Sequence, residues 1–113
     1  MTKTITVLDR SITATVLQLD EGLDVSLLGG DSSHVGAVTF AESNSTHQTM
    51  ERAGHKEAML SESWAVALAK ASQQPVTVRC GIHYDHASPA QIAQILNACT
   101  LLLGEIEASV MLC

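Results

Sequence analysis

The chain has 113 residues, 46% of them hydrophobic, which is enough for one compact domain with a real core and too few for two. Twelve acidic residues against six basic ones give a net charge of -6, which argues against nucleic acids and anionic membranes as partners but allows one small anionic ligand. No apolar stretch reaches the roughly 20 residues that span a bilayer, the first residues lack a signal pattern, and three widely spaced cysteines argue against a disulfide framework. We therefore expect a single soluble, cytoplasmic domain over residues 1–113.

The first part of the chain has the composition of β-strands. Four segments are rich in β-branched and aliphatic side chains, namely residues 5–8, 12–19, 23–28 and 35–41. Asp20-Glu21-Gly22 supplies the turn chemistry of a hairpin, and a glycine-rich loop at 29–33 precedes the last of these segments. The polar, weakly patterned residues 42–55 are interpreted as a long loop in which His47 is solvated.

Two helices are predicted, one on each side of a further strand. From about position 56 the apolar residues recur every four positions, at Leu60, Trp64 and Leu68, until a Gln-Gln-Pro sequence ends the pattern. Residues 76–83 form the strand, and Ser88 as N-cap, with Pro89 and Gln91 at the first and third helical positions, begins the second helix. The apolar stripe of that helix is expected to pack on the sheet and consists of Ile92, Ile95, Leu96, Cys99, Leu102, Leu103 and Ile106.

These elements predict an α+β fold in which a mostly antiparallel, meandering sheet carries two helices on one face. The early strands also have apolar residues on their second face, such as Leu17 beside Val16 and Leu28 beside Leu27. We therefore expect the second face of the sheet to be covered, and a symmetric dimer would cover it.

The strand at 76–83 continues into the titratable residues of GIHYDHASP. Because side chains alternate along a strand, two sets lie on opposite faces. The set that faces the helices consists of Val76, Val78, Cys80, Ile82 and Tyr84. The set on the other, polar face consists of Thr77, Arg79, Gly81, His83 and Asp85. Gly81 allows another backbone or a flat ligand to approach closely, and Asp85 can fix the tautomer of His83. Taken alone, this pair favours a structural role at a solvated strand end, with a ligand site as the alternative, and His86 is not assigned.

Two further motifs contain residues that suit a ligand. GGDSSHVGAV offers backbone N–H groups to an anion, or it is a wide hairpin in which Gly36 marks a bulge. GHKE lies at a helix start, where free N–H groups together with His55 and Lys56 suit a phosphate, or where an ordinary cap stands beside a solvated lysine.

Together, GGDSSHVGAV, GHKE and GIHYD followed by a Ser-Pro helix start resemble the small prenylated-flavin chaperone family, the LpdD-like proteins associated with UbiD-type gallate decarboxylases. The resemblance runs from about Gly29 to Leu103. It implies a fold similar to proteasome assembly chaperones and a non-catalytic homodimer that binds reduced prenylated FMN and delivers it to an apo-decarboxylase. The residues that would surround the cofactor are His34, Gly36, His55, Lys56, Arg79, Gly81, His83 and Asp85.

Two other functions stay open. A small metal- or His-dependent enzyme would use His34, His55 and His83, although no pair of possible ligands has the spacing of a zinc site. A structural or assembly subunit would bind a protein partner but no flavin. For a chaperone, we expect no catalytic and no metal-binding residues.

Overall fold

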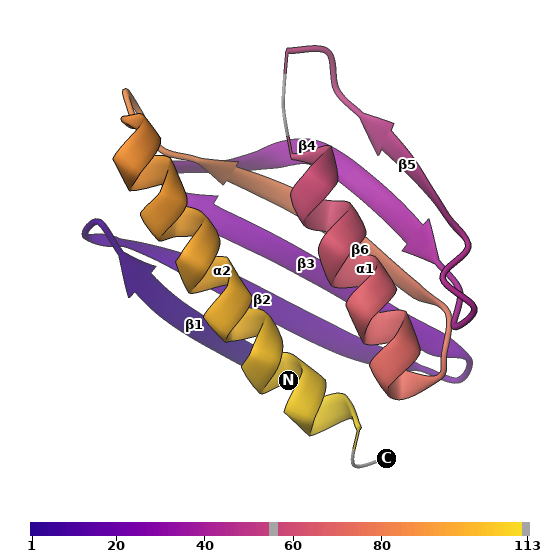
Figure 1. The fold of residues 1–113 in the computed structure, drawn as a ribbon. Coiled ribbons are helices and arrows are strands. Elements are labelled where there is room, and N and C mark those ends of the chain that lie inside the picture. The colour runs from indigo at the N-terminus through magenta and orange to yellow at the C-terminus, as the bar shows by residue number, and fades with distance from the viewer. Residues whose placement is uncertain (55–56, 112–113) are drawn as a thin grey trace.

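The computed structural model describes residues 1–54 and 57–111, and in this part of the chain six strands form one sheet with two helices on one of its faces (Figure 1). The strands are β1 (Thr2–Val7), β2 (Arg10–Leu19), β3 (Gly22–Gly30), β4 (Ser32–Ala41), β5 (His47–Glu51) and β6 (Val76–His83). The helices are α1 (Ala58–Ser72) and α2 (Pro89–Val110). The predicted α+β class, with both helices on one face, is confirmed.

The order of the strands in the sheet is β1-β2-β3-β6-β4-β5. β6 pairs with β3 in parallel and with β4 antiparallel, and the other neighbours are antiparallel. The predicted, mostly antiparallel sheet is confirmed, and its meander is interrupted at one place, because β6 lies between two strands that are consecutive in the chain. The glycine-rich segment is also no wide loop: β3 continues to Gly30, β4 begins at Ser32, and Asp31 alone connects them.

The core lies between the helices and the sheet. Trp64 and Leu68 of α1, and Cys99, Leu102 and Ile106 of α2, are buried against the central strands. Burial raises the pKa of the Cys99 thiol to about 11 and also raises that of Cys80, so both thiols behave as apolar core groups.

Helix α2 begins as the sequence predicts. The Ser88 side chain accepts a hydrogen bond from the Gln91 N–H, the Gln91 side chain accepts one from the Ser88 N–H, and Pro89 occupies the first turn. The expected apolar stripe is too wide, however. Ile92 and Leu96 are each 47% exposed because only the flank of the helix that carries Ile95 and Cys99 faces the sheet.

The expected long loop at 42–55 contains the edge strand β5, which pairs with β4. The sequence HQTME does not alternate apolar and polar residues. Because backbone hydrogen bonds hold this strand in the sheet, its side chains do not show the pattern from which strands are predicted. Its Thr49 hydroxyl lies 2.8 Å from the Thr39 hydroxyl, which in turn lies 2.8 Å from that of Ser61 in α1. His47 is exposed, as expected, and its Nδ1 lies 3.1 Å from the Ser45 carbonyl oxygen.

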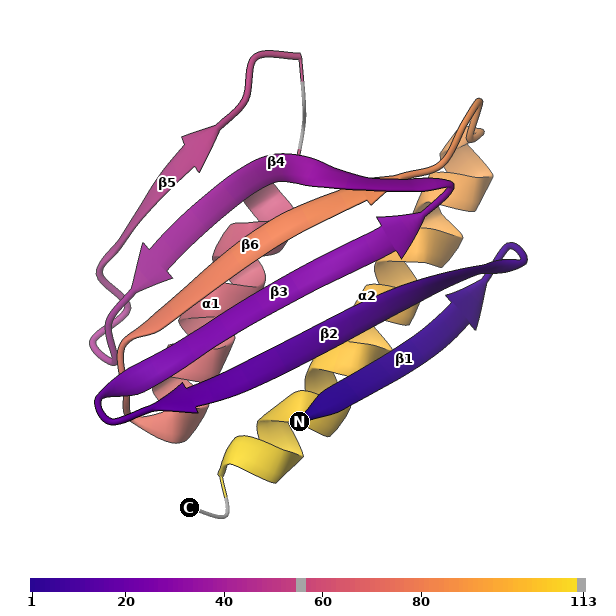
Figure 2. The same cartoon turned by 180° about the vertical axis from the view of Figure 1, so that it is seen from behind.

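The second face of the sheet carries no helix in the described part of the chain (Figure 2). Its side chains mix threonines with partly exposed apolar groups, among them Leu17, Leu28, Val38, Phe40 and Met50. Of the two described helices, neither is long and apolar enough to cross a membrane.

Candidate functional site

A bulge in β4 forms the centre of the candidate site. Ser32 pairs with His83 and Ser33 with Ile82, but the next regular pair joins Ala37 to Cys80. Residues 34–36 of β4 therefore lie opposite Gly81 alone. Extra residues of this kind bend a strand and redirect its side chains, and bulges are common beside binding sites.

Two glycines make this bulge possible. A Cβ atom on Gly81 would overlap the backbone carbonyl of His34, and a Cβ atom on Gly36 would overlap the carboxylate of Glu57. Of the two possibilities that the sequence left open for Gly81, another backbone is thus the group that approaches it. Gly36 lies in the bulge itself, as one reading of the sequence predicted.

Glu57 reaches the bulge from the start of α1. It occupies the N-cap position, but its side chain does not cap the helix. The Glu51 carboxylate of β5 does so instead, since it accepts a hydrogen bond of 2.9 Å from the Ala58 N–H. The Glu57 carboxylate is therefore directed to His34, whose Nε2 lies 2.7 Å from its Oε1, with only 17% and 14% of the two side chains exposed.

A second histidine–carboxylate pair lies beside the first. His83 Nε2 is 2.9 Å from Asp85 Oδ1, and the two side chains are 51% and 63% exposed. The rings of His34 and His83 are 6.2 Å apart and meet edge to face at 70°. The site thus has a sheltered pair and an open pair, each with a carboxylate that can fix its imidazole tautomer.

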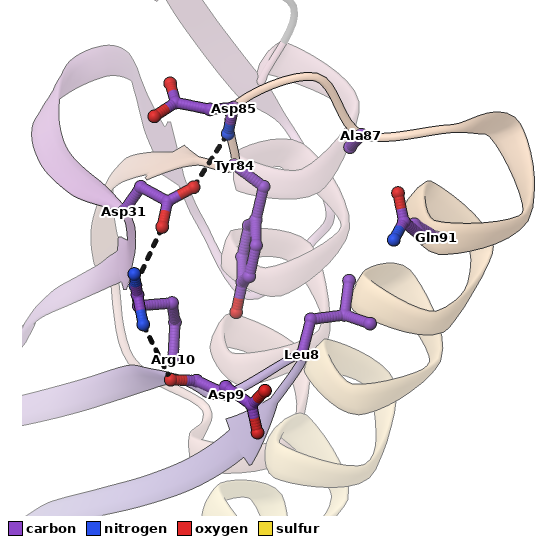
Figure 3. A pocket seen from close by; sticks show the side chains of 8 residues that line it. All are labelled: Leu8, Asp9, Arg10, Asp31, Tyr84, Asp85, Ala87 and Gln91. Carbon is purple, nitrogen blue, oxygen red and sulfur yellow. Dashed lines mark hydrogen bonds and ion pairs between the residues drawn. The ribbon is translucent and has the colours of Figure 1, made fainter.

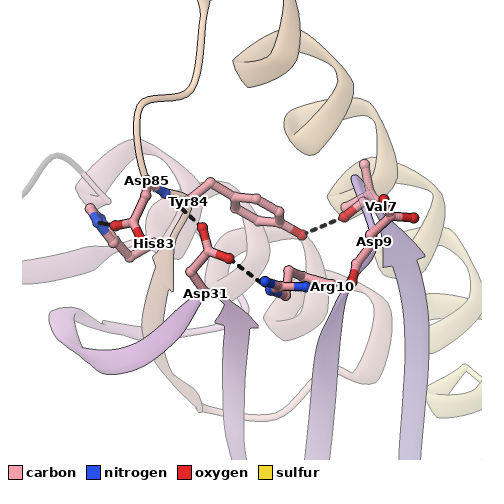
Figure 4. A network of polar contacts seen from close by, with 7 residues as sticks. All are labelled: Val7, Asp9, Arg10, Asp31, His83, Tyr84 and Asp85. Carbon is pink, nitrogen blue, oxygen red and sulfur yellow. Dashed lines mark hydrogen bonds and ion pairs between the residues drawn. The ribbon is translucent and has the colours of Figure 1, made fainter.

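Asp31 connects the open pair to Arg10 at the start of β2 (Figure 4). Its Oδ2 accepts a hydrogen bond of 2.8 Å from the Asp85 N–H, its Oδ1 accepts one of 2.7 Å from Arg10 Nε, and its own N–H donates to the His83 carbonyl at 2.7 Å. The Asp85 N–H, with help from Arg10, lowers the pKa of the Asp31 carboxyl below its usual value.

A cleft of about 240 Å³ lies on the other side of Asp31, between the β1–β2 turn and the start of α2 (Figure 3). Its wall includes Arg10, Tyr84, Asp85 and Gln91. The Tyr84 hydroxyl donates to the Val7 carbonyl at 2.9 Å, and burial raises the pKa of this phenol.

The structure brings together five of the residues that the sequence singled out: His34, Gly36, Gly81, His83 and Asp85. Arg79 is on the same strand, about 13 Å from His83 at strand spacing, and its Nε lies 3.9 Å from Asp24 Oδ1. His55 and Lys56 lie outside the described residues.

Sequence reasoning missed the contributions of Glu57 and Asp31. Both lie in motifs that the sequence singled out, GHKE and GGDSSH, but their partners are distant in the chain. Glu57 pairs with His34, and Asp31 pairs with the backbone of Asp85. Within residues 1–54 and 57–111, no group of three or more His, Cys, Asp or Glu side chains could hold a metal ion. The imidazole and carboxylate groups of the two pairs can offer hydrogen-bond donors and acceptors to an organic ligand.

Comparisons with known proteins agree with this architecture. Residues 7–111 match the family model of the prenylated flavin chaperone LpdD-like domain. A comparison with curated proteins gives no match. A chain from the crystal structure of a chaperone complex for yeast 20S proteasome assembly is similar, with a TM-score of 0.55 and 18% identity, over 96% of this chain and 98% of that chain. At this identity the likeness concerns the fold, and it confirms the expected similarity to proteasome assembly chaperones.

Proposed function

Because the chain belongs to the prenylated flavin chaperone LpdD-like family, we propose that it is a cytoplasmic, non-catalytic carrier of reduced prenylated FMN. The carrier delivers this cargo to an apo-decarboxylase of the UbiD type that acts on a gallate-like aromatic acid. The decarboxylation chemistry belongs to the cofactor in that enzyme, and the carrier only has to bind, shelter and release it.

One observation supports this assignment most directly: two histidines, each paired with a carboxylate, meet at a bulge that two glycines make possible. The edge of a flavin ring system presents alternating donors and acceptors, and imidazole and carboxylate groups can match both kinds. The sheltered pair of His34 and Glu57 suits a fixed contact. The half-exposed His83 and Asp85 suit a contact from which the cargo can leave.

The phosphate of the cargo requires N–H groups or cations. Lys56 and His55 remain our proposal for this role, and Arg79 is the other basic group on the polar face of β6. Arg52 lies at the bulge, where its side chain donates to the Val35 carbonyl at 3.1 Å and its backbone N–H to the Gly36 carbonyl at 2.9 Å.

The proposal predicts that the His83→Ala protein takes up reduced prenylated FMN about tenfold more weakly than the wild type, the cost of one lost hydrogen bond to a charged or polar ring. Anaerobic titration followed by flavin absorbance measures this uptake. The His47→Ala protein is the matched control, because His47 is exposed on β5 and the described hydrogen bond of its side chain is to the Ser45 carbonyl in the preceding turn. Equal affinity for His83→Ala and wild type would remove His83 from the site.

A small enzyme is the rival function, and the closeness of two histidine–carboxylate pairs is the observation that favours it, since such pairs transfer protons. The two functions differ in what happens to the ligand. A carrier returns reduced prenylated FMN unchanged after anaerobic incubation, as mass spectrometry of the released ligand would show. Conversion of the ligand, abolished by His34→Ala, would favour the enzyme.

We also propose that two copies pack through the second face of the sheet. The molecule measures 39 by 28 Å across its longer axes, and the strands run across most of this outline in Figure 2, so the face can supply the roughly 800 Å² per partner of a standard interface. Asp24 and Arg79 lie side by side on this face. In a symmetric pair, the carboxylates and guanidinium groups of the two copies can pair crosswise.

The dimer can be tested at Phe40, which is 44% exposed on the second face. We expect the wild type to have the molar mass of two chains by light scattering, and the Phe40→Asp protein that of one chain, because an unpaired charge would be buried at the interface. Met59→Asp is the control, since Met59 is exposed on α1. A wild type that is monomeric at all concentrations would contradict this arrangement.

A further inference from the structure

We propose that Asp31 is a positioning residue that holds the end of β6 in the shape required for the His83–Asp85 pair, with Arg10 as its support. The inference rests on the proposed function for its consequence in flavin uptake, but its structural part can be tested without any ligand.

Asp31 forms hydrogen bonds with the backbone on both sides of Tyr84. Its N–H donates to the His83 carbonyl, and its carboxylate accepts from the Asp85 N–H. These two bonds fix the direction in which the chain leaves the strand, so that the side chains of His83 and Asp85 meet at 2.9 Å. Tyr84 is directed the other way, into the cleft (Figure 3). Its hydroxyl reaches the Val7 carbonyl there (Figure 4).

Gly30 shows how closely the segment before Asp31 approaches the end of β6. Its φ of 86° lies in the left-handed region, and a Cβ atom on it would overlap the His83 carbonyl oxygen. The residue before Asp31 therefore has to be a glycine for Asp31 to come within reach of residues 83–85.

Arg10 holds the carboxylate in place from the β1–β2 turn. Its Nε donates to Asp31 Oδ1, and its Nη1 donates to the Asp9 carbonyl at 3.2 Å. The chain of contacts thus runs from the β1–β2 turn through Asp31 to Asp85 and then to His83 (Figure 4). A change at Arg10 or Asp31 would reach the site although neither side chain forms a described hydrogen bond with either histidine ring, and the charge of Asp31 also interacts with His83.

The asymmetry of an amide makes Asp31→Asn a sharp test. A carboxylate accepts from both Arg10 and the Asp85 N–H, whereas an amide has one accepting oxygen and presents N–H groups to the other donor. We expect exchange of the Asp85 amide hydrogen to become about tenfold faster in ligand-free Asp31→Asn, and uptake of reduced prenylated FMN to weaken by a similar factor. Asp9→Asn is the matched control, because Asp9 lines the same cleft but contacts Arg10 only through its backbone carbonyl.

A nuclear magnetic resonance titration supplies a readout that a merely structural role would not move. The charged or titratable groups around these contacts are Arg10, Asp9, Tyr84, His83 with its neighbour His34, and Asp85. In the wild type, the Arg10 Nε–H signal should follow ionisation of Asp31 with a midpoint below 3.8, the usual value for this carboxyl. A midpoint at or above 3.8 would overturn the positioning role, because the charged carboxylate would then gain no stabilisation from the Asp85 N–H and Arg10.

The outcomes separate the two proposals. Faster exchange at Asp85 and weaker uptake in Asp31→Asn, together with a wild-type midpoint below 3.8, would support both. Faster exchange with unchanged uptake would support the positioning role and contradict the placement of the flavin beside His83. Unchanged exchange at Asp85 would overturn the positioning role, whatever the uptake.

Discussion

The Gly81→Val protein is expected to bind reduced prenylated FMN at least about a hundredfold more weakly than the wild type, because the bulge that contains His34 cannot form opposite a side chain at position 81. A Cβ atom at this position would overlap the His34 carbonyl, which belongs to the backbone and cannot rotate away. Because β4 has to shift, the free energy of unfolding should also fall by about 2 kcal/mol. Anaerobic titration and urea denaturation measure the two effects.

Gly104→Ala is the control for this variant. Gly104 lies in the middle of α2, and a Cβ atom on it would have no neighbour within 4 Å. We expect this protein to be more stable than the wild type by about 1 kcal/mol, the usual gain for alanine over glycine in a helix, and to bind the cofactor normally. Normal uptake by Gly81→Val would show that the bulge does not contribute to the site.

The second large effect is expected at Gly36, where a small change should expel the Glu57 carboxylate from its place beside His34. The overlapping atoms belong to the end of a flexible side chain, so the fold can accept Gly36→Ala at little cost in stability. Uptake should nevertheless weaken about tenfold, because His34 loses a charge-assisted hydrogen bond that holds it in place.

A double-mutant cycle makes this explanation specific. Glu57→Ala should weaken uptake about as much as Gly36→Ala, and the double variant should be no worse than either one, because the alanine methyl group then has free space. Glu105→Ala, which removes an exposed carboxylate from α2, should bind as the wild type does. Fully additive losses would mean that Gly36 and Glu57 act independently.

Much of the fold could be predicted because its signals are local. The hairpin turn at Asp20-Glu21-Gly22, the strand at 76–83 and the capping box at Ser88 each depend on residues within a few positions of one another, and all three are present. The insertion of β6 between β3 and β4 depends on pairing between distant segments, which no local pattern records. The strand β5 was not predicted for a related reason, because an exposed edge strand needs no apolar face.

The candidate site was partly predictable for the same physical reasons. Gly36, Gly81, His83 and Asp85 stand out because a bulge and a polar strand end require particular residue types at particular spacings. Glu57 does not stand out, because a glutamate before a helix is usually read as a favourable first-turn charge. Only the tertiary structure shows that Glu51 caps the helix and that Glu57 is directed to His34.

Anaerobic binding of reduced prenylated FMN, compared with reduced FMN that lacks the prenyl group, decides whether the protein is a carrier of prenylated flavin. We expect stoichiometric uptake of the prenylated form, with an affinity at least about tenfold higher than that for plain FMN, since the prenyl group buries further apolar surface. No uptake of either flavin, or equal affinity for both, would contradict the assignment of this protein as a prenylated-flavin carrier.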